Sequence, residues 1–321
     1  MSTLIEQAAL RLQQLRQAGV DVPEMDAPPG AEVADSPAAK PAPAVQAPAE
    51  PAKPAFVSRR VELDLAALAN AGYITPDAPR SALADQYRVL KRPLIGNALG
   101  KGSATLKHGN LIMVTSALAG EGKTFTSVNL AMSIAAELDH TVMLVDADVA
   151  RPSVLRVLGL PPGPGLLDVL EGKVELPGAL LRTNVDKLAV LPSGTPHPRA
   201  TELLASEAMS KLLDDMATRY PDRIIIFDSP PLLLTTESRV LATHMGQVVV
   251  VVQAGRTLQS AVQQALATIE SCPVRMMVLN QARMDGAGAY GYGYGYGYGA
   301  YGYGYGYGQG DSGATVAAGS A

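Results

Sequence analysis

Between residues 105 and 285, short apolar runs alternate with segments of helical periodicity, and this alternation restricts the fold more than any other feature of the chain. The runs have the length of strands, and several are almost continuous Val, Ile or Leu, which is typical of strands covered by helices on both faces. The alternation therefore predicts an α/β domain with a mostly parallel sheet flanked by helices. The expected strands are residues 111–115, 141–146, 188–191, 223–228, 247–252 and 274–279.

Charge and cysteine content exclude several classes of protein. The net charge is -4, from Lys+Arg 26 against Asp+Glu 30, and no Lys/Arg-rich run exists, so we expect no nucleic-acid partner. The single cysteine, Cys272, excludes an intramolecular disulfide and a cysteine-based zinc site. No apolar run approaches the ~18 residues of a membrane-spanning helix. Glu6, Arg11 and Arg16 interrupt any signal-peptide core, so we expect a cytoplasmic protein.

Composition changes along the chain and divides it into five segments. Residues 1–22 have an amphipathic helical pattern, and such a helix packs either on its own domain or on a partner. More than half of residues 23–57 are Pro or Ala, which predicts an extended linker. Residues 58–104 are expected to form a docking or oligomerisation segment. Residues 105–285 form the α/β domain, and residues 286–321 form a tail.

A glycine-containing loop, Ala-Leu-Ala-Gly-Glu-Gly-Lys-Thr, follows the expected strand 111–115 and opens a helix. This strand–loop–helix context is typical of a phosphate-binding loop. Gly120 and Gly122 let backbone N–H groups wrap phosphates at a helix N-terminus, where anions are favoured. Lys123 is expected to reach the β and γ phosphates, and the Thr124 hydroxyl to bind Mg²⁺. The helix should bury one stripe: Val128, Ala131, Ile134, Ala135 and Leu138.

Three aspartates end two of the apolar strands. Asp146 and Asp148 lie at the end of the strand at 141–146, and Asp228 ends the strand at 223–228. Ligands of parallel sheets bind at the carboxyl ends of the strands. Two carboxylates one residue apart repel each other unless a metal or cation lies between them. Asp228 has the position from which phosphate-loop NTPases hold Mg²⁺.

The C-terminal tail alternates tyrosine with glycine. Nine of the 12 tyrosines of the chain lie here, and glycine at every second position makes ordering costly in entropy, so we expect residues 286–321 to be disordered. The tyrosines are Tyr290, Tyr292, Tyr294, Tyr296, Tyr298, Tyr301, Tyr303, Tyr305 and Tyr307.

Taken in order, these motifs resemble those of the bacterial tyrosine kinases of polysaccharide export. The phosphate loop AGEGKT, the acidic motif LVDADVARP, the motif FDSPP and the tyrosine cluster occur here in the family's order. The resemblance covers about residues 80–310. The upstream segment SALADQYRVLKRPLIGNA is similar to the soluble, exosortase-associated (XrtA-type) subgroup.

The resemblance implies a protein-tyrosine autokinase that transfers the γ-phosphoryl group of ATP to its own tail. Because a phenol with a pKa near 10 is only ~0.1% ionised at pH 7, a positioned carboxylate assists. Asp146 is the candidate base, with Asp148 and Asp228 orienting Mg²⁺, although the roles of Asp146 and Asp148 can be exchanged. Lys123 and the loop amides stabilise charge on the phosphates.

The implied cofactors are ATP and Mg²⁺. Asn280, after the last expected strand, contacts adenine according to the resemblance, and a role as an ordinary turn residue is the alternative. Metal binding is expected from Thr124, Asp148 and Asp228. The residues expected to bind the nucleotide are Ala119, Gly120, Glu121, Gly122, Lys123, Thr124, Phe125 and Asn280.

The family also implies partners and a location. Relatives use a Glu-x-x-Arg-x-x-Arg helix for ring assembly, and this chain has Asp85-x-x-Arg88-x-x-Lys91. We therefore expect a homo-oligomeric ring through the N-terminal segment. A membrane chain-length determinant (polysaccharide copolymerase) would activate the kinase and recruit it to the inner face of the membrane, and a tyrosine phosphatase would reverse the modification.

Two other interpretations remain open at the level of sequence. The first is a switch ATPase like the partition and cell-division (ParA/MinD-like) ATPases; their loop has a lysine where this chain has Leu118, and they have no tyrosine tail. The second is a scaffold whose aromatic tail binds polysaccharide or protein, or self-associates.

Overall fold

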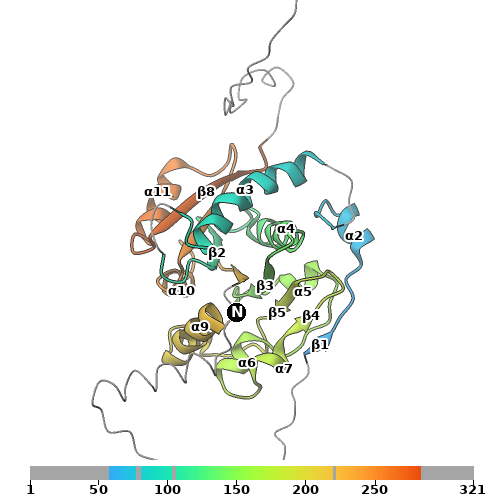
Figure 1. Cartoon of the computed structure of the whole chain (residues 1–321). Coiled ribbons are helices and arrows are strands. Elements are labelled where there is room, and N and C mark those ends of the chain that lie inside the picture. Colours follow the sequence, from blue (N-terminus) through green and yellow to red (C-terminus); the bar gives the residue numbers. More distant parts are fainter. Residues whose placement is uncertain (1–57, 77–80, 103–105, 220–221, 283–321) are drawn as a thin grey trace, which may run out of the picture. The chain divides into compact units, whose positions relative to one another are not determined.

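The computed structural model describes residues 58–76, 81–102, 106–219 and 222–282. These residues form an eight-stranded sheet in the order β1-β4-β5-β3-β6-β2-β7-β8 (Figure 1). Every neighbouring pair is parallel except β4 and β5. The strands are β1 (Arg59–Arg60), β2 (Leu111–Ser116), β3 (Thr141–Asp146), β4 (Leu181–Arg182), β5 (Leu188–Leu191), β6 (Arg223–Asp228), β7 (Gln247–Gln253) and β8 (Val274–Asn280).

The six strands predicted from the apolar runs are confirmed, as is the mostly parallel α/β fold. Two further strands, β1 and β4, have only two residues each and add to one edge of the sheet. No apolar pattern marks them: β1 is Arg-Arg, and β4 follows a four-residue helix directly. The expected helix at 1–22, the linker at 23–57 and the tyrosine tail lie outside the described residues.

Helices cover both faces of the sheet and create two cores. One core is formed with α6, α7, α8, α9, α10 and α11, and the other with α2, α3, α4 and α5. Alternate residues of β2 face opposite cores, as period-two geometry requires. The helices are α2 (Leu65–Asn70), α3 (Ala82–Ala98), α4 (Lys123–Ala135), α5 (Val154–Val157), α6 (Leu166–Leu170), α7 (Leu176–Ala179), α8 (Ala200–Leu204), α9 (Glu207–Arg219), α10 (Glu237–Ala242) and α11 (Gln259–Ala267).

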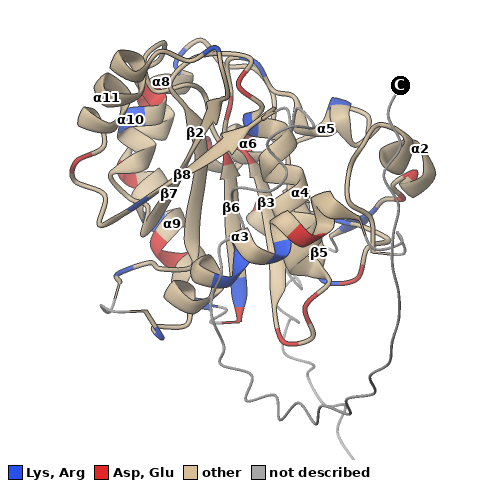
Figure 2. Ribbon diagram, turned by 90° about the horizontal axis from the view of Figure 1, so that it is seen from above, with Lys and Arg blue, Asp and Glu red and all other residues tan. Residues whose placement is uncertain are grey.

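The segment between β1 and β2 packs onto α4. The Ser81 hydroxyl caps α3 by accepting from Ala84 N at 3.1 Å, and Tyr87, Leu94 and Ile95 of α3 are buried in the same core as α4. Among the described residues, no helix has both the length and the apolarity needed to cross a membrane. In Figure 2, acidic and basic residues are interspersed along the described ribbon.

One residue of the predicted buried stripe is placed differently. Val128, Ala131, Ile134 and Ala135 are buried on α4, but Leu138 is 85% exposed. The prediction for Leu138 was wrong because α4 ends at Ala135, so the helical period no longer applies there.

The strand order brings the three motifs together at the carboxyl end of the sheet. β6 lies between β2 and β3, and Asp228 is in register with Asp146 on one side and with Val114 on the other. The loops that follow β2, β3 and β6 are therefore neighbours at the carboxyl end of the sheet. Open α/β sheets bind their ligands at this end.

Candidate active site

The loop between β2 and α4 contains two glycines whose backbone lies in the left-handed region. Gly120 has φ +85° and Gly122 has φ +95°, a region that side chains rarely adopt. Gly122 is also the N-cap of α4, and a Cβ there would overlap the side-chain amide of Asn280. α4 therefore begins at the carboxyl end of the sheet, and the N–H groups of its first turn have no partner within the helix.

The two glycines make a matched pair of substitutions. Gly120→Ala should destabilise the fold by about 1 kcal/mol. A Cβ there would contact no other atom, so the only cost is that of a left-handed backbone conformation for alanine. Gly122→Ala should destabilise it by about 2–3 kcal/mol, because Asn280 must also move and lose its hydrogen bond. Chemical denaturation measures both values. Adding Asn280→Ala to Gly122→Ala should recover part of the loss; no recovery would contradict the overlap.

Glu121 turns its side chain away from the open side of the loop. It is 2% exposed, and its carboxylate accepts from Leu118 N at 2.6 Å and from the Thr257 hydroxyl. Its backbone carbonyl accepts from Asn280 Nδ2 at 2.9 Å. The Glu121 side chain thus links two parts of the loop and connects the loop to the segment after β7. The Asn280 side chain connects the loop to β8. Neither bracing role was predicted from the sequence.

Asp228 is held by hydroxyl groups of α4. Its two oxygens accept from Thr124 Oγ1 at 2.7 Å and from Ser127 Oγ at 2.9 Å, and its side chain is buried. Thr124 Oγ1 is also 2.8 Å from Ser153 Oγ, on the loop that follows β3. Burial raises the pKa of Asp228 to about 6, although both hydroxyl hydrogen bonds and Lys123 act in the opposite direction.

Asp146 and Asp148 differ in their surroundings. Asp146 is buried; one carboxylate oxygen accepts from Ser153 N at 3.0 Å and from Val154 N at 2.9 Å, while Oδ1 has no hydrogen-bond partner. Burial, followed by the charge of Asp228, raises the pKa of Asp146 to about 7. Asp148 is only partly buried, and its pKa is raised chiefly by burial.

These shifts predict how the metal-free protein responds to pH. The pKa values of Asp146 and Asp228 in the fold, about 7 and about 6, exceed the ordinary value of an unfolded aspartate. Their contribution to stability is present below the unfolded pKa and is lost as pH rises through the folded values. In EDTA, lowering the pH from about 8 to about 6 should therefore raise the unfolding temperature. Asp146→Asn should flatten this slope; a falling temperature in the parent protein would contradict the assignment.

A cavity of about 440 Å³ opens over the loop. Ala119, Gly120, Lys123, Thr124 and Asp148 line it, so five of the predicted site residues are brought together there. Glu121, Gly122, Phe125, Asp146, Asp228 and Asn280 do not line it; the ring of Phe125 packs on Tyr73 at 5.1 Å between centroids. The cavity is also lined by three polar or charged residues for which no role was predicted: Arg151 of the LVDADVARP motif, Ser153 and Arg156.

The residues at this site are suited to a Mg²⁺ ion that is bound only in part by protein side chains, with water and phosphate as its other ligands. Among the described residues, no cluster of three His, Cys, Asp or Glu side chains forms a closed metal cage. Mg²⁺ instead keeps several waters and uses one or two carboxylates together with substrate phosphates. The Thr124 hydroxyl beside Asp228 and the unpartnered Oδ1 of Asp146 are oxygen donors of this kind.

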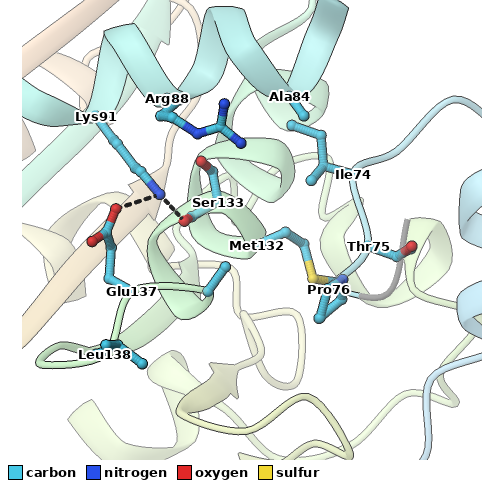
Figure 3. A pocket seen from close by; sticks show the side chains of 11 residues that line it. Ile74, Thr75, Pro76, Ala84, Arg88, Lys91, Met132, Ser133, Glu137 and Leu138 are labelled. Carbon is cyan, nitrogen blue, oxygen red and sulfur yellow. Dashed lines mark hydrogen bonds and ion pairs between the residues drawn. The ribbon is translucent and has the colours of Figure 1, made fainter. Parts of the chain in front are cut away.

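A second cavity, of about 260 Å³, lies between α3 and α4 (Figure 3). Lys91 of α3 reaches Glu137 Oε1 at 2.7 Å and donates to the Ser133 carbonyl. Lys91 is 4% exposed, so its contacts with Ser133 and Glu137 form a buried connection between α3 and the C-terminal end of α4. Asp85 and Arg88 pair with each other and stay largely exposed. The three residues of the Asp85-x-x-Arg88-x-x-Lys91 motif therefore have different surroundings.

The fold and the loop together define a P-loop nucleotide-binding protein. The AAA domain family matches residues 109–280. Tyrosine-protein kinase YwqD of Bacillus subtilis is 30% identical over 214 residues, which are 66% of this chain and 86% of YwqD. The solved VpsO kinase domain is 27% identical, with a TM-score of 0.51, over 63% of this chain and 100% of that domain.

A longer relative is the succinoglycan biosynthesis transport protein ExoP of Rhizobium meliloti. It is 30% identical over 222 residues, which are 68% of this chain but only 27% of ExoP. This chain therefore spans about a quarter of that protein. The match to YwqD, of which this chain covers 86%, shows that the chain belongs to the bacterial tyrosine kinases. The exosortase-associated subgroup stays a prediction.

Proposed function

We propose that this kinase transfers the γ-phosphoryl group of ATP to the tyrosines of its own C-terminal segment or that of a neighbouring copy. The observation that carries the proposal is the position of Asn280. This residue ends β8 and donates to the loop at Glu121, so the chain leaves the sheet beside the phosphate-binding loop. The tyrosines begin ten residues further on, at Tyr290.

The reaction forms a bond between a tyrosine oxygen and the γ-phosphorus, and it breaks the bond from that phosphorus to the bridging oxygen of ADP. The phenolic proton passes to a carboxylate. Asp148 lines the cavity whereas Asp146 is buried, so the structure favours Asp148 as the base and Asp146 as a group beside the metal. This exchanges the roles first assigned to these two residues.

The loop and its neighbours bind the phosphates. The N–H groups at the start of α4 and the Lys123 ammonium oppose the charge of the β and γ phosphates, and Arg151 and Arg156 add positive charge to the cavity wall. Thr124, Asp228 and Asp146 would hold Mg²⁺, which when bound neutralises phosphate charge. Asn280 is retained as the proposed adenine contact through its side-chain oxygen, Oδ1, because its Nδ2 donates to Glu121.

The proposal is tested by following where the γ-phosphate goes. With radiolabelled ATP and Mg²⁺, we expect label on the protein, and a variant with all nine tail tyrosines replaced by Phe should lose it. A switch ATPase would instead release the same amount of phosphate to water from both proteins and label neither. A scaffold would bind its ligand equally well after Lys123→Met.

We further propose a role in exopolysaccharide synthesis and export, as the name of ExoP suggests for that relative. A membrane chain-length determinant (polysaccharide copolymerase) would recruit the cytoplasmic kinase to the membrane and activate it, and a tyrosine phosphatase would reset it. Each phosphate adds about −1.5 to −2 charges, so multiple modification would repel neighbouring copies. Phosphorylation would thereby break up a ring.

The ring would form through residues 58–104. Asp85 and Arg88 are exposed and can meet a neighbouring copy, whereas Lys91 is committed to Glu137 inside its own chain. The proposed ring contact therefore uses the first two residues of the motif. Substituting both Asp85 and Arg88 by Ala should shift the protein toward monomer in analytical ultracentrifugation; an unchanged oligomer would remove this contact from the proposal.

A further inference from the structure

β8 presents an unpaired edge. It is the last strand in the sheet order, and the described residues include no strand on its outer side. The Asn280 carbonyl accepts from Ala254 N at 2.9 Å, toward β7. Because backbone groups alternate in direction along a strand, the N–H and C=O groups of Arg275, Met277 and Leu279 point to the open edge.

The same three residues are exposed through their side chains. Met277 is 61% and Leu279 is 65% exposed. They are in register with Val250 and Val252 of β7, which pack in the core formed with α11. This face of β7 is therefore covered, whereas Met277 and Leu279 are exposed on the same face of β8. Proteins usually protect such an edge by shortening, charging or covering it. At the other end of the sheet, β1 is protected in this way, because it has only two residues and both are Arg.

The chain that continues beyond this edge has the pattern of a strand. In residues 290–298, tyrosine alternates with glycine, so an extended backbone would place every tyrosine on one face. Ala300 interrupts the alternation, and in residues 301–307 the tyrosines have the opposite phase. Residues 281–289, which include Gly286 and Gly288, are long enough to reverse the chain direction after β8.

We propose that residues 290–298 bind the open edge of β8 as an antiparallel strand of the same chain. Their tyrosine rings would cover Met277 and Leu279 beside α11, and their glycines would take the face on which Met276 and Val278 pack against the second core. Residues 301–307 stay undocked, because continuing the strand past Ala300 would turn their tyrosines to the other face. One run of the tail is thus held on the sheet, and the other is free.

This docking has a consequence that rests on the proposed function. An antiparallel strand on β8 runs away from the phosphate-binding loop, so the docked tyrosines are withheld from the site. The tyrosines of residues 301–307 should therefore be phosphorylated before those of residues 290–298. Phosphate on the docked run would place dianions against Met277 and Leu279 and release the strand.

Hydrogen exchange of the full chain, resolved by residue, tests the docking. We compare the wild type with a variant carrying Gly293→Pro and Tyr294→Pro. Adjacent residues of a strand direct their N–H groups to opposite sides, so one of the two prolines removes an N–H that would pair with β8 in either register. The matched control carries Gly304→Pro and Tyr305→Pro. The outward amides of Arg275, Met277 and Leu279 should exchange on the order of tenfold faster in the first variant only. The inward amides of Met276 and Val278 serve as internal references.

Two results would overturn the proposal. The outward amides would exchange equally in all three proteins if nothing covers the edge. Alternatively, their protection would grow with protein concentration if the tail of a second copy covers it. A parallel time course of tail phosphorylation by mass spectrometry tests the order of the two runs. If no tyrosine is modified at all, the proposed function fails while the exchange result still decides the docking.

Discussion

Lys123→Met should reduce tail phosphorylation by about 10²- to 10³-fold, the usual loss when one positioned charge at a phosphoryl-transfer site is removed. Lys123 lines the cavity with Thr124 and Asp148. Its ammonium also opposes the effect of burial, which raises the pKa of Asp148 and of Asp228. Methionine keeps the length of the side chain and removes only its charge. The measurement is the initial rate of phosphotyrosine formation with MgATP.

The control for this substitution is Lys211→Met on α9. Lys211 is exposed and pairs with Glu207 on the surface, so its loss should change neither the rate nor the unfolding temperature. If Lys123→Met retained most of the wild-type rate while folding normally, the loop would not be the site of phosphoryl transfer.

Glu137→Ala should destabilise the fold by about 3 kcal/mol, because it leaves the buried ammonium of Lys91 without its carboxylate partner. Lys91 Nζ lies 2.7 Å from Glu137 Oε1, and its remaining hydrogen bond is to the Ser133 carbonyl. Lys91→Met removes the same charge pair from the other side. It should cost much less, about 1 kcal/mol or nothing, since an apolar side chain of similar length fills the space.

Urea denaturation measures this asymmetry. Asp85→Ala serves as the surface control, because its pair with Arg88 is exposed and should contribute no more than about 0.5 kcal/mol. Equal destabilisation by Glu137→Ala and Lys91→Met would show instead that the buried pair is net stabilising. The Lys91 position would then hold α3 on α4 by its charge rather than by its packing.

The sheet was predictable because its strands are buried on both faces. Runs such as those of β6 and β7 are apolar without interruption, and the glycine loop and the aspartates mark where three strands end, β2, β3 and β6. The strand order brought these ends together at one edge, as parallel topology requires. The two-residue strands β1 and β4 were not predictable, since two residues have no periodicity.

The second layer of the site depends on contacts between distant residues. Thr257 meets Glu121, and Asn280 meets the carbonyl of Glu121, across separations that no local pattern records. Ser127 had a usable signal, because it follows Lys123 by one helical turn and so faces Asp228. The burial of Lys91 had none, because a charged residue on an amphipathic helix is normally expected to face solvent.

Peptide mass spectrometry of the full chain after incubation with MgATP tests the central claim most directly. The chain should gain several phosphates, all on the peptide that spans residues 290–307, and Lys123→Met should gain them about 10²- to 10³-fold more slowly. Steady hydrolysis of ATP with an unmodified tail would contradict the proposal that the tail is the substrate of this kinase.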